Sequence, residues 1–389
     1  MAGVEQVHTT AMATDGRAVG RLSDGKVVFV DGALPGETVS VAIVADRARF
    51  ADAEVDEVIT PSADRVGPPC PHFTEGCGGC QWQYVSPAAQ RRLKAEMIAE
   101  SLRRIGHLDD IPMEATVELP EENWRTTIRA GVRQGRAALR RMSSHELVGV
   151  DGCLVAHPLL RPLLDGRRYG RADRVLLRCG ARTGEVLVRP TPAGTVIDVP
   201  DHVVRDFIHE VVADRRWRIS ASSFFQSRPD GADALVALVT AAARDAPGGG
   251  RALDAYSGVG LFGGVLAASG WSVAAVEGSA SSVADARVNL ADFGDQVNVV
   301  RADMNQWRAT RPFDLVVADP SRAGLAKLGA AALLSAEARR MVLISCDVAS
   351  LGRDAGILVA GGYRLRSVTP VDLFPHSWHV EVVTVFDRA

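Results

Sequence analysis

Acidic and nucleophilic side chains stand where apolar, strand-like segments end in the second half of the sequence. Asp254, Glu277, Asp319 and Cys346 each lie at the end of such a segment. The carboxyl ends of parallel strands meet at one edge of a sheet, which is where ligands of such sheets bind, so we expect these four residues to share that edge. A lone cysteine after a buried strand is ordinarily a small core residue, but at this edge Cys346 is predicted to be a nucleophile.

The segment from Arg251 to Glu277 predicts a strand, a glycine loop, a helix and a second strand. The loop Ser257-Gly258-Val259-Gly260 allows a tight turn and a close approach of the backbone to a ligand. Glu277 follows roughly 20 positions later, where an acidic residue hydrogen-bonds ribose hydroxyls. The dinucleotide pattern Gly258-x-Gly260-x-x-Gly263 is also satisfied, so the loop alone indicates a nucleoside-type cofactor and leaves an NAD(P)-dependent oxidoreductase open.

A carboxylate near the end of the sequence supplies a general base. Glu381 opens the strand-like run from Val382 to Phe386. A glutamate in that place is ordinarily just exposed. Combined with the nucleophile predicted at Cys346, it becomes the candidate proton acceptor.

Bulk composition bounds the class of protein. The 389 residues suffice for two or three domains with a sizeable core. A net charge of -3 argues against bulk attraction to nucleic acid, although local arginine clusters remain compatible with it. No apolar run approaches the ~20 residues of a membrane span, and the first residues lack the apolar core of a signal peptide. We therefore expect a cytoplasmic protein without a membrane partner.

Three regions follow one another along the sequence. In residues 1–60, short β-rich runs separated by turn signals such as Asp15-Gly16 predict a small antiparallel barrel. Residues 61–223 are predicted to form a central region, with a helix over 88–106 that is a candidate to pack on the catalytic domain. The charges on that helix, Lys94 among them, predict a solvated face. Alternating helix and strand patterns over 224–389 predict a parallel sheet flanked by helices.

Three of the six cysteines form a cluster, Cys70-x6-Cys77-x2-Cys80. In a cytosolic protein such residues are more typical of metal ligands, a nucleophile or core packing than of disulfides.

Taken together, the sequence resembles the class I S-adenosylmethionine-dependent RNA (uracil-5-)-methyltransferases. That family has an N-terminal TRAM domain, an iron-sulfur centre and a Rossmann-like catalytic domain. The likeness covers nearly the whole chain and implies an α/β fold class: a Rossmann-like methyltransferase domain with an N-terminal OB-like β-barrel and a central α+β domain. It also implies that residues 61–223 form the iron-sulfur and central RNA-binding region. The motifs that carry it are Phe224-Phe225-Gln226, the glycine loop, Asp319-Pro320-x-Arg322-x-Gly324, Ser345-Cys346 and His379-Val380-Glu381.

The resemblance also implies roles for individual residues. Cys346 would be the nucleophile and Glu381 the base. Contacts to S-adenosylmethionine would come from Gln226, Tyr256, Glu277 and Asp319, with Asp303 on the adenine side. The ligands of a [4Fe-4S] cluster would be Cys70, Cys77, Cys80 and Cys153. Zinc is the chemical alternative, because four thiolates suit either metal. Cys179 has no partner in this scheme and is assigned to packing.

The implied reaction explains why a thiol and a carboxylate are both needed. C5 of uracil is a poor nucleophile, so a thiolate first adds to C6 and C5 then attacks the methyl group. A base must remove the C5 proton before the thiolate leaves. The target uracil must also leave its stack, which favours a single-stranded or loop uridine. Phe224 or Phe225 is a candidate to stack on it, although both rings could equally belong to the core. The expected partner is RNA, ribosomal in preference to transfer RNA, with no DNA, and the protein is expected to be a monomer.

Some positions depart from the family pattern. Ser321 and Leu261 replace other common residues, and Asp347 places a negative charge beside the proposed thiolate. That charge would oppose a lowered thiol pKa unless the side chain points away. A non-catalytic RNA-binding protein with a decayed methylase site is therefore a further alternative.

Overall fold

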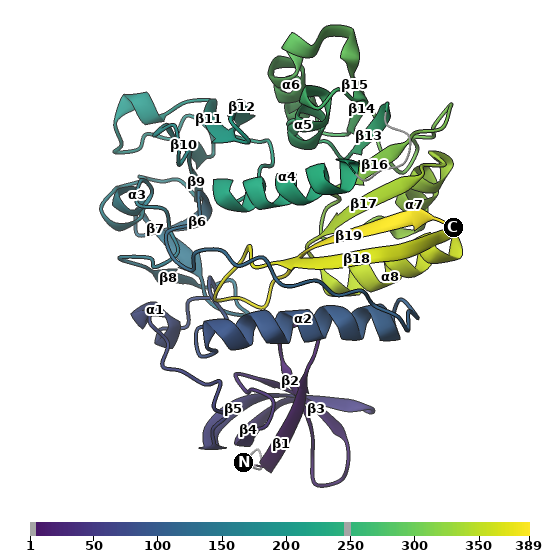
Figure 1. Ribbon diagram of the computed structural model, residues 1–389. Helices are drawn as coiled ribbons and strands as arrows, with labels where there is room; N and C mark the ends of the chain where they lie inside the picture. The colour runs from purple at the N-terminus through teal and green to yellow at the C-terminus, as the bar shows by residue number, and fades with distance from the viewer. Residues whose placement is uncertain (1–4, 245–249) are drawn as a thin grey trace.

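The protein is built around three large sheets and a two-stranded hairpin, counted over the described residues (Figure 1). The computed structural model describes residues 5–244 and 250–389. A closed five-stranded barrel comes first, a five-stranded antiparallel sheet follows, and a seven-stranded sheet comes last. Within those ranges, no helix has the length and apolar character needed to cross a membrane.

The barrel occupies the region where the turn signals predict it. Its strands run in the order β1-β2-β3-β5-β4, and alternate side chains such as Val7, Val28 and Val39 fill its interior. All neighbouring strands are antiparallel except β3 and β5, which pair in parallel. The strands are β1 (Glu5–Met12), β2 (Ala18–Arg21), β3 (Val27–Asp31), β4 (Thr38–Asp46) and β5 (Phe50–Thr60).

A long helix, α2 (Pro87–Arg104), lies between the barrel and the seven-stranded sheet (Figure 1). It follows the short helix α1 (Pro71–Thr74) and buries Leu93, Ile98 and Leu102. On the catalytic side it packs against α8 (Val348–Ala360). Gly352 makes this approach possible, because a Cβ there would lie 2.6 Å from the carbonyl oxygen of Ser101.

The central sheet has the order β10-β9-β6-β7-β8. One of its faces covers a core that includes Ile128, Leu177 and Val188 and is closed by helix α3. Cys179 is buried in this core, in keeping with its assignment to packing. The elements are β6 (Thr127–Arg133), β7 (Arg136–Arg140), β8 (Leu147–Gly149), α3 (Arg161–Asp165), β9 (Arg174–Cys179) and β10 (Val186–Thr191).

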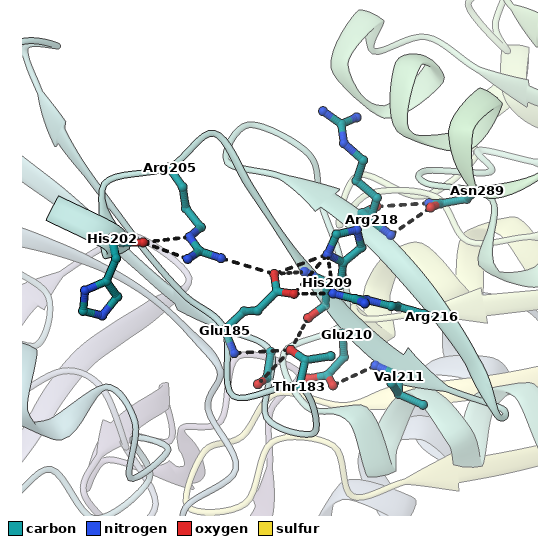
Figure 2. A network of polar contacts seen from close by, with 11 residues as sticks. Thr183, Glu185, His202, Arg205, His209, Glu210, Val211, Arg216, Arg218 and Asn289 are labelled. Atoms are coloured by element: carbon teal, nitrogen blue, oxygen red, sulfur yellow. Dashed lines mark hydrogen bonds and ion pairs between the residues drawn. The ribbon is translucent and has the colours of Figure 1, made fainter. Parts of the chain in front are cut away.

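A hairpin of β11 (Phe207–Val212) and β12 (Arg215–Ser220) joins the central sheet to the catalytic domain. Figure 2 shows Glu185, just before β10, accepting the backbone N–H of His209 at 2.9 Å and pairing with Arg205 and Arg216. On the other side, Asn289 of α6 (Ala280–Asn289) accepts the N–H of Arg218 and donates to its carbonyl oxygen. The hairpin is thus hydrogen-bonded both to the central sheet and to the domain that contains the seven-stranded sheet.

The seven-stranded sheet has the order β15-β14-β13-β16-β17-β19-β18, with β19 antiparallel to both neighbours. Helices α4, α5 and α6 cover one face, and α7 and α8 cover the other. Every residue of β16 and β17 is buried, as expected for strands covered on both faces. The strands are β13 (Arg251–Ala255), β14 (Ser272–Glu277), β15 (Val297–Arg301), β16 (Leu315–Ala318), β17 (Arg340–Ser345), β18 (Tyr363–Val371) and β19 (Glu381–Arg388). The remaining helices are α4 (Pro229–Arg244), α5 (Leu261–Ala268) and α7 (Ala326–Ser335).

The order of the strands fixes where a ligand can bind. From β13 the chain proceeds outward through β14 and β15, then returns to the other side of β13 as β16. The crevice outside the carboxyl ends of β13 and β16 is therefore the topological switch point, where ligands of open α/β sheets bind.

Candidate active site

The glycine loop joins β13 to α5 at the switch point. Tyr256, Gly258 and Gly260 have positive φ angles of 59°, 55° and 92°. At Gly260 a side chain is excluded, because a Cβ would lie 2.7 Å from Cδ1 of Leu290. The phenol of Tyr256 is half-buried beside α7, and burial raises its pKa to about 12. It is therefore a neutral hydrogen-bonding group at the crevice.

Two carboxylates stand beside this loop. Glu277 accepts the N–H of Gly258 through Oε2 at 3.0 Å and that of Ser279 through Oε1 at 2.6 Å. Asp303 follows the neighbouring strand β15 and is exposed. Since the backbone N–H of Ala302 donates to the carbonyl oxygen of Glu277, the two acids lie on adjacent chains. The structure therefore brings both to one edge, as the sequence predicts.

Asp254 lies below the loop. It is 1% exposed, and its Oδ2 accepts the N–H of Gly263 in the first turn of α5 at 2.7 Å. Burial raises the pKa of this carboxyl to about 8. Asp254 thus supports the loop that a ligand would touch.

Asp319 follows β16 on the other side of the switch point. Its Oδ2 accepts a hydrogen bond from Nε2 of Gln226 at 3.1 Å. Burial raises the pKa of Asp319 to about 7, against the effect of this hydrogen bond. The pair shows that Phe224-Phe225-Gln226 and the Asp319 motif, 93 residues apart, form one site.

Cys346 and Glu381 are brought together by strand pairing. Ser345 of β17 pairs with Val382 of β19, so Cys346 and Glu381 stand at the same end of neighbouring strands. Burial, with the negative charges of Glu381 and Asp319, raises the pKa of the Cys346 thiol to about 12. Glu381 is 3% exposed, and burial, with the charge of Asp319, raises its pKa well above the usual value. The site therefore favours a protonated thiol at rest and makes the Glu381 carboxylate a stronger base than an ordinary carboxylate.

Asp347 does not need to face the thiol. Its side chain caps α8, with Oδ1 accepting the N–H of Ser350 at 2.8 Å. Arg322 is the positive charge that opposes the raised pKa of Cys346. Its Nη2 lies 3.3 Å from Nδ1 of His379. Helix capping thus gives Asp347 a structural role, while its negative charge still adds to the raised pKa of Cys346.

Helix α2 holds the loop that leads into Glu381. Nζ of Lys94 donates to Oδ1 of Asp372 at 2.8 Å and to the carbonyl oxygen of Phe374 at 3.0 Å. Oε1 of Gln90 accepts the N–H of His376 at 2.7 Å. The prediction of a solvated face was wrong for Lys94, whose side chain is 5% exposed. A signal was present, since Gln90 and Lys94 lie one helical turn apart beside the apolar Leu93.

The four cysteines proposed as metal ligands line one cavity, together with Arg125 and His72. All four are free thiols. Burial raises the pKa of Cys77 and raises that of Cys80 to about 12. Over residues 5–244 and 250–389, no group of three or more His, Cys, Asp or Glu side chains is arranged to hold a metal ion.

Known proteins resemble this chain at two levels: one domain family matches the barrel, and curated relatives match nearly the whole chain. The TRAM domain family matches residues 4–55. An uncharacterized RNA methyltransferase of Streptomyces coelicolor is 35% identical, over 99% of this chain and 93% of the relative. The 23S rRNA (uracil(1939)-C(5))-methyltransferase RlmD of Halomonas elongata is 32% identical, over 99% of this chain and 90% of its own length.

A solved structure confirms the fold class. The tRNA (uracil-54, C5)-methyltransferase of Pyrococcus abyssi, crystallised with S-adenosyl-L-homocysteine, superposes with a TM-score of 0.75. It is 22% identical, over 98% of this chain and 99% of that protein. The chain thus belongs to the family of S-adenosylmethionine-dependent RNA (uracil-C5)-methyltransferases.

Proposed function

We propose that this protein methylates C5 of a uridine in structured RNA, with ribosomal RNA favoured over transfer RNA. The observation that carries the proposal is the pairing of Ser345 with Val382, because it sets a thiol and a carboxyl side by side at the ligand edge of the sheet. The RNA substrates named for the relatives in Halomonas and Methylococcus, both 23S rRNA, support the preference for ribosomal RNA.

Each residue of the site has a task in this reaction. Bound S-adenosylmethionine supplies the electrophilic methyl group. After losing its proton, Cys346 adds as the thiolate to C6 of uracil, and C5 then takes the methyl group while S-adenosylhomocysteine leaves. Glu381, as the carboxylate, accepts the C5 proton, and the Cys346–C6 bond breaks as the C5–C6 double bond forms again. The hydrogen-bonded pair of Gln226 and Asp319 lies beside the reacting atoms, while Glu277, Tyr256 and Asp303 form the nucleoside side of the crevice.

The raised pKa of Cys346 shapes this mechanism. A thiol with a pKa of about 12 is nearly all protonated at neutral pH, so the nucleophile must lose its proton as the substrates bind. The negative charges of Glu381 and Asp319 add to burial in disfavouring the thiolate, and Arg322 opposes them only in part. We therefore propose that Cys346 is a protonated thiol in the free enzyme and becomes the thiolate only after the substrates bind.

The test is methyl transfer to defined RNA fractions. Purified protein is incubated with methyl-labelled S-adenosylmethionine and RNA from a host that lacks this gene, and nucleosides are analysed by mass spectrometry. We expect labelled 5-methyluridine in the ribosomal fraction and none with Cys346→Ala. Glu381→Gln is expected to accumulate a denaturation-resistant protein–RNA adduct, because elimination needs the base. Full activity of Cys346→Ala would overturn the mechanism.

We propose further that Cys70, Cys77, Cys80 and Cys153 hold a [4Fe-4S] cluster. A single zinc ion is the chemical alternative, because four thiolates suit either metal, and the resemblance to the family favours the cluster. In a [4Fe-4S] cluster each thiolate binds a different iron atom, so the sulfurs surround a larger core. The shared lining of one cavity by all four cysteines supports that arrangement.

The role of the cluster would be structural, since methyl transfer requires no electron. Cys80 packs with Trp124 and Val155, and Phe374 of the loop before Glu381 packs against this group. Protein purified in air should be brown, and Cys153→Ser should lose the colour. Colourless protein with stoichiometric zinc would refute the assignment.

A further inference from the structure

The five strands of the central sheet carry seven arginines and no acidic residue. Side chains alternate between the two faces of a strand. The apolar set, including Ile128, Ala137 and Leu177, faces the core with α3. The arginines therefore share the opposite face, which we call the arginine face: Arg129, Arg133, Arg136, Arg140, Arg174, Arg178 and Arg189.

Strand register brings these charges close together. Arg133 pairs directly with Arg136, and Arg174 lies opposite Gly131 on the same face. Directly opposed residues of antiparallel strands have Cβ atoms about 4.5–5.5 Å apart, and like charges in such pairs are destabilising. The sheet thus holds a repulsion that an anion would relieve.

Two of the seven arginines are buried or paired with a carboxylate, while Arg133 donates to the carbonyl oxygen of Leu147 and Arg140 lies beside His145. Arg178 is buried and donates to the carbonyl oxygen of Ser220, and Arg189 pairs with Asp206. The other five are exposed, and no carboxylate of the described residues pairs with any of them. By contrast, Arg205 and Arg216 of the neighbouring segment both pair with Glu185 (Figure 2).

The arginine face begins beside the active site. Thr126, just before β6, donates to the carbonyl oxygen of Ser227 through its N–H at 2.8 Å and its hydroxyl at 2.9 Å. Ser227 follows Gln226, which holds Asp319. Phe224, two residues earlier, is 63% exposed, whereas Phe225 packs into the core. The segment that supplies Gln226 to the active site thus carries an exposed aromatic ring and is hydrogen-bonded to the start of β6.

We propose that the arginine face binds the phosphate backbone of the single-stranded RNA that flanks the target uridine. This rests on the proposed function and identifies which surface holds its substrate. Guanidinium groups bind phosphate oxygens bidentately, and the unpaired charges are complementary to a polyanion in a chain whose net charge is -3. The contacts would position the RNA without reading its sequence.

The test measures the salt dependence of RNA binding. Wild type and Arg129→Gln/Arg174→Gln are titrated with a uridine-containing single-stranded RNA oligonucleotide at several KCl concentrations. Each phosphate contact contributes about 0.7 to the slope of log K against log salt for single strands, so we expect the slope to fall by about 1.4. Arg364→Gln is the matched control. Arg364 is exposed and pairs in register with Asp387, at the opposite end of β18 from the Val371–Glu381 pair.

The outcomes separate this inference from the proposed function. An unchanged slope in the double variant, equal to that of Arg364→Gln, would overturn the inference even if 5-methyluridine forms. A reduced slope with normal S-adenosylhomocysteine binding and normal turnover at saturating RNA would support it. If wild type forms no 5-methyluridine yet the slope still falls, the arginine face binds RNA and the proposed reaction is wrong.

Discussion

Replacing Lys94 by methionine should destabilise the protein and slow the step that needs Glu381. The Lys94 and Asp372 side chains are 5% and 2% exposed, and Lys94→Met leaves the carboxylate buried without its ammonium partner. Breaking a buried ion pair costs about 3–5 kcal/mol. Nη1 of Arg91 lies 3.9 Å from the other oxygen of Asp372, so part of the negative charge of Asp372 stays balanced in the variant. We therefore expect a loss of about 3 kcal/mol, at the lower end of that range.

Urea unfolding, followed by tryptophan fluorescence, measures the loss. Arg104→Met is the control on the same helix, because its pair with Glu100 is exposed and its loss should stay below about 0.5 kcal/mol. Lys94→Met/Asp372→Leu removes both charges and should recover most of the stability, since no orphaned carboxylate remains. Losses that simply add in the double variant would refute the reasoning.

The catalytic consequence is measured separately. Lys94 also holds the carbonyl oxygen of Phe374, in the loop that leads to Glu381. In Lys94→Met we expect the covalent RNA adduct to form at the normal rate and to resolve slowly, with S-adenosylhomocysteine binding unchanged. Lys94→Arg should restore part of the rate of resolution. Equal slowing of adduct formation and resolution would show that the helix contributes only to stability.

Three further predictions concern single groups of the site. Asp254 has a folded pKa of about 8, so the folded state binds more protons than the unfolded state between about pH 4 and 8. The wild type should therefore lose thermal stability relative to Asp254→Asn as pH rises through this window. A constant difference in Tm from pH 5 to 9 would contradict the assignment. Alkylation of Cys346, followed by peptide mass spectrometry, should accelerate about tenfold per pH unit up to pH 10 because its pKa is about 12, whereas a plateau near pH 9 would indicate an unperturbed thiol. Glu277→Gln should weaken S-adenosylhomocysteine binding by about 10- to 100-fold in calorimetry, since hydrogen bonds to charged groups contribute about 1.5–3 kcal/mol; an unchanged Kd would place the ribose elsewhere.

Much of the catalytic half could be predicted from local patterns. Buried parallel strands appear as continuous apolar runs, and their carboxyl ends meet at one edge, so the positions of Glu277, Asp319 and Cys346 followed from spacing alone. The closed barrel was likewise indicated by turn signals, and the TRAM match confirms it. These features depend on neighbours in sequence or on the general geometry of sheets.

Other features depend on partners far away in the sequence. Lys94 and Asp372 are 278 residues apart, so nothing near Lys94 in the sequence shows that it is buried. The position of Glu381 beside Cys346 requires that β19 insert between β17 and β18, which spacing does not reveal. The sequence shows the charge of Asp347 beside the proposed thiolate, but it does not show that this side chain also caps α8. The cluster role of the cysteines and the boundaries proposed at residues 60 and 223 remain predictions.

The insertion of β19 has a consequence for how the protein is made. Strand β19 is synthesised after both strands that it joins, so β17 and β18 emerge from the ribosome with unpaired edges. Helix α2 is without its ion-pair partner for longer, because the 278 residues between Lys94 and Asp372 take roughly 15–60 s to translate at about 5–20 residues per second. Until Asp372 has been made, Lys94 has no buried partner, and Cys346 has no neighbouring base until synthesis reaches Glu381. The nascent chain therefore cannot complete the active site before strand β19 is made.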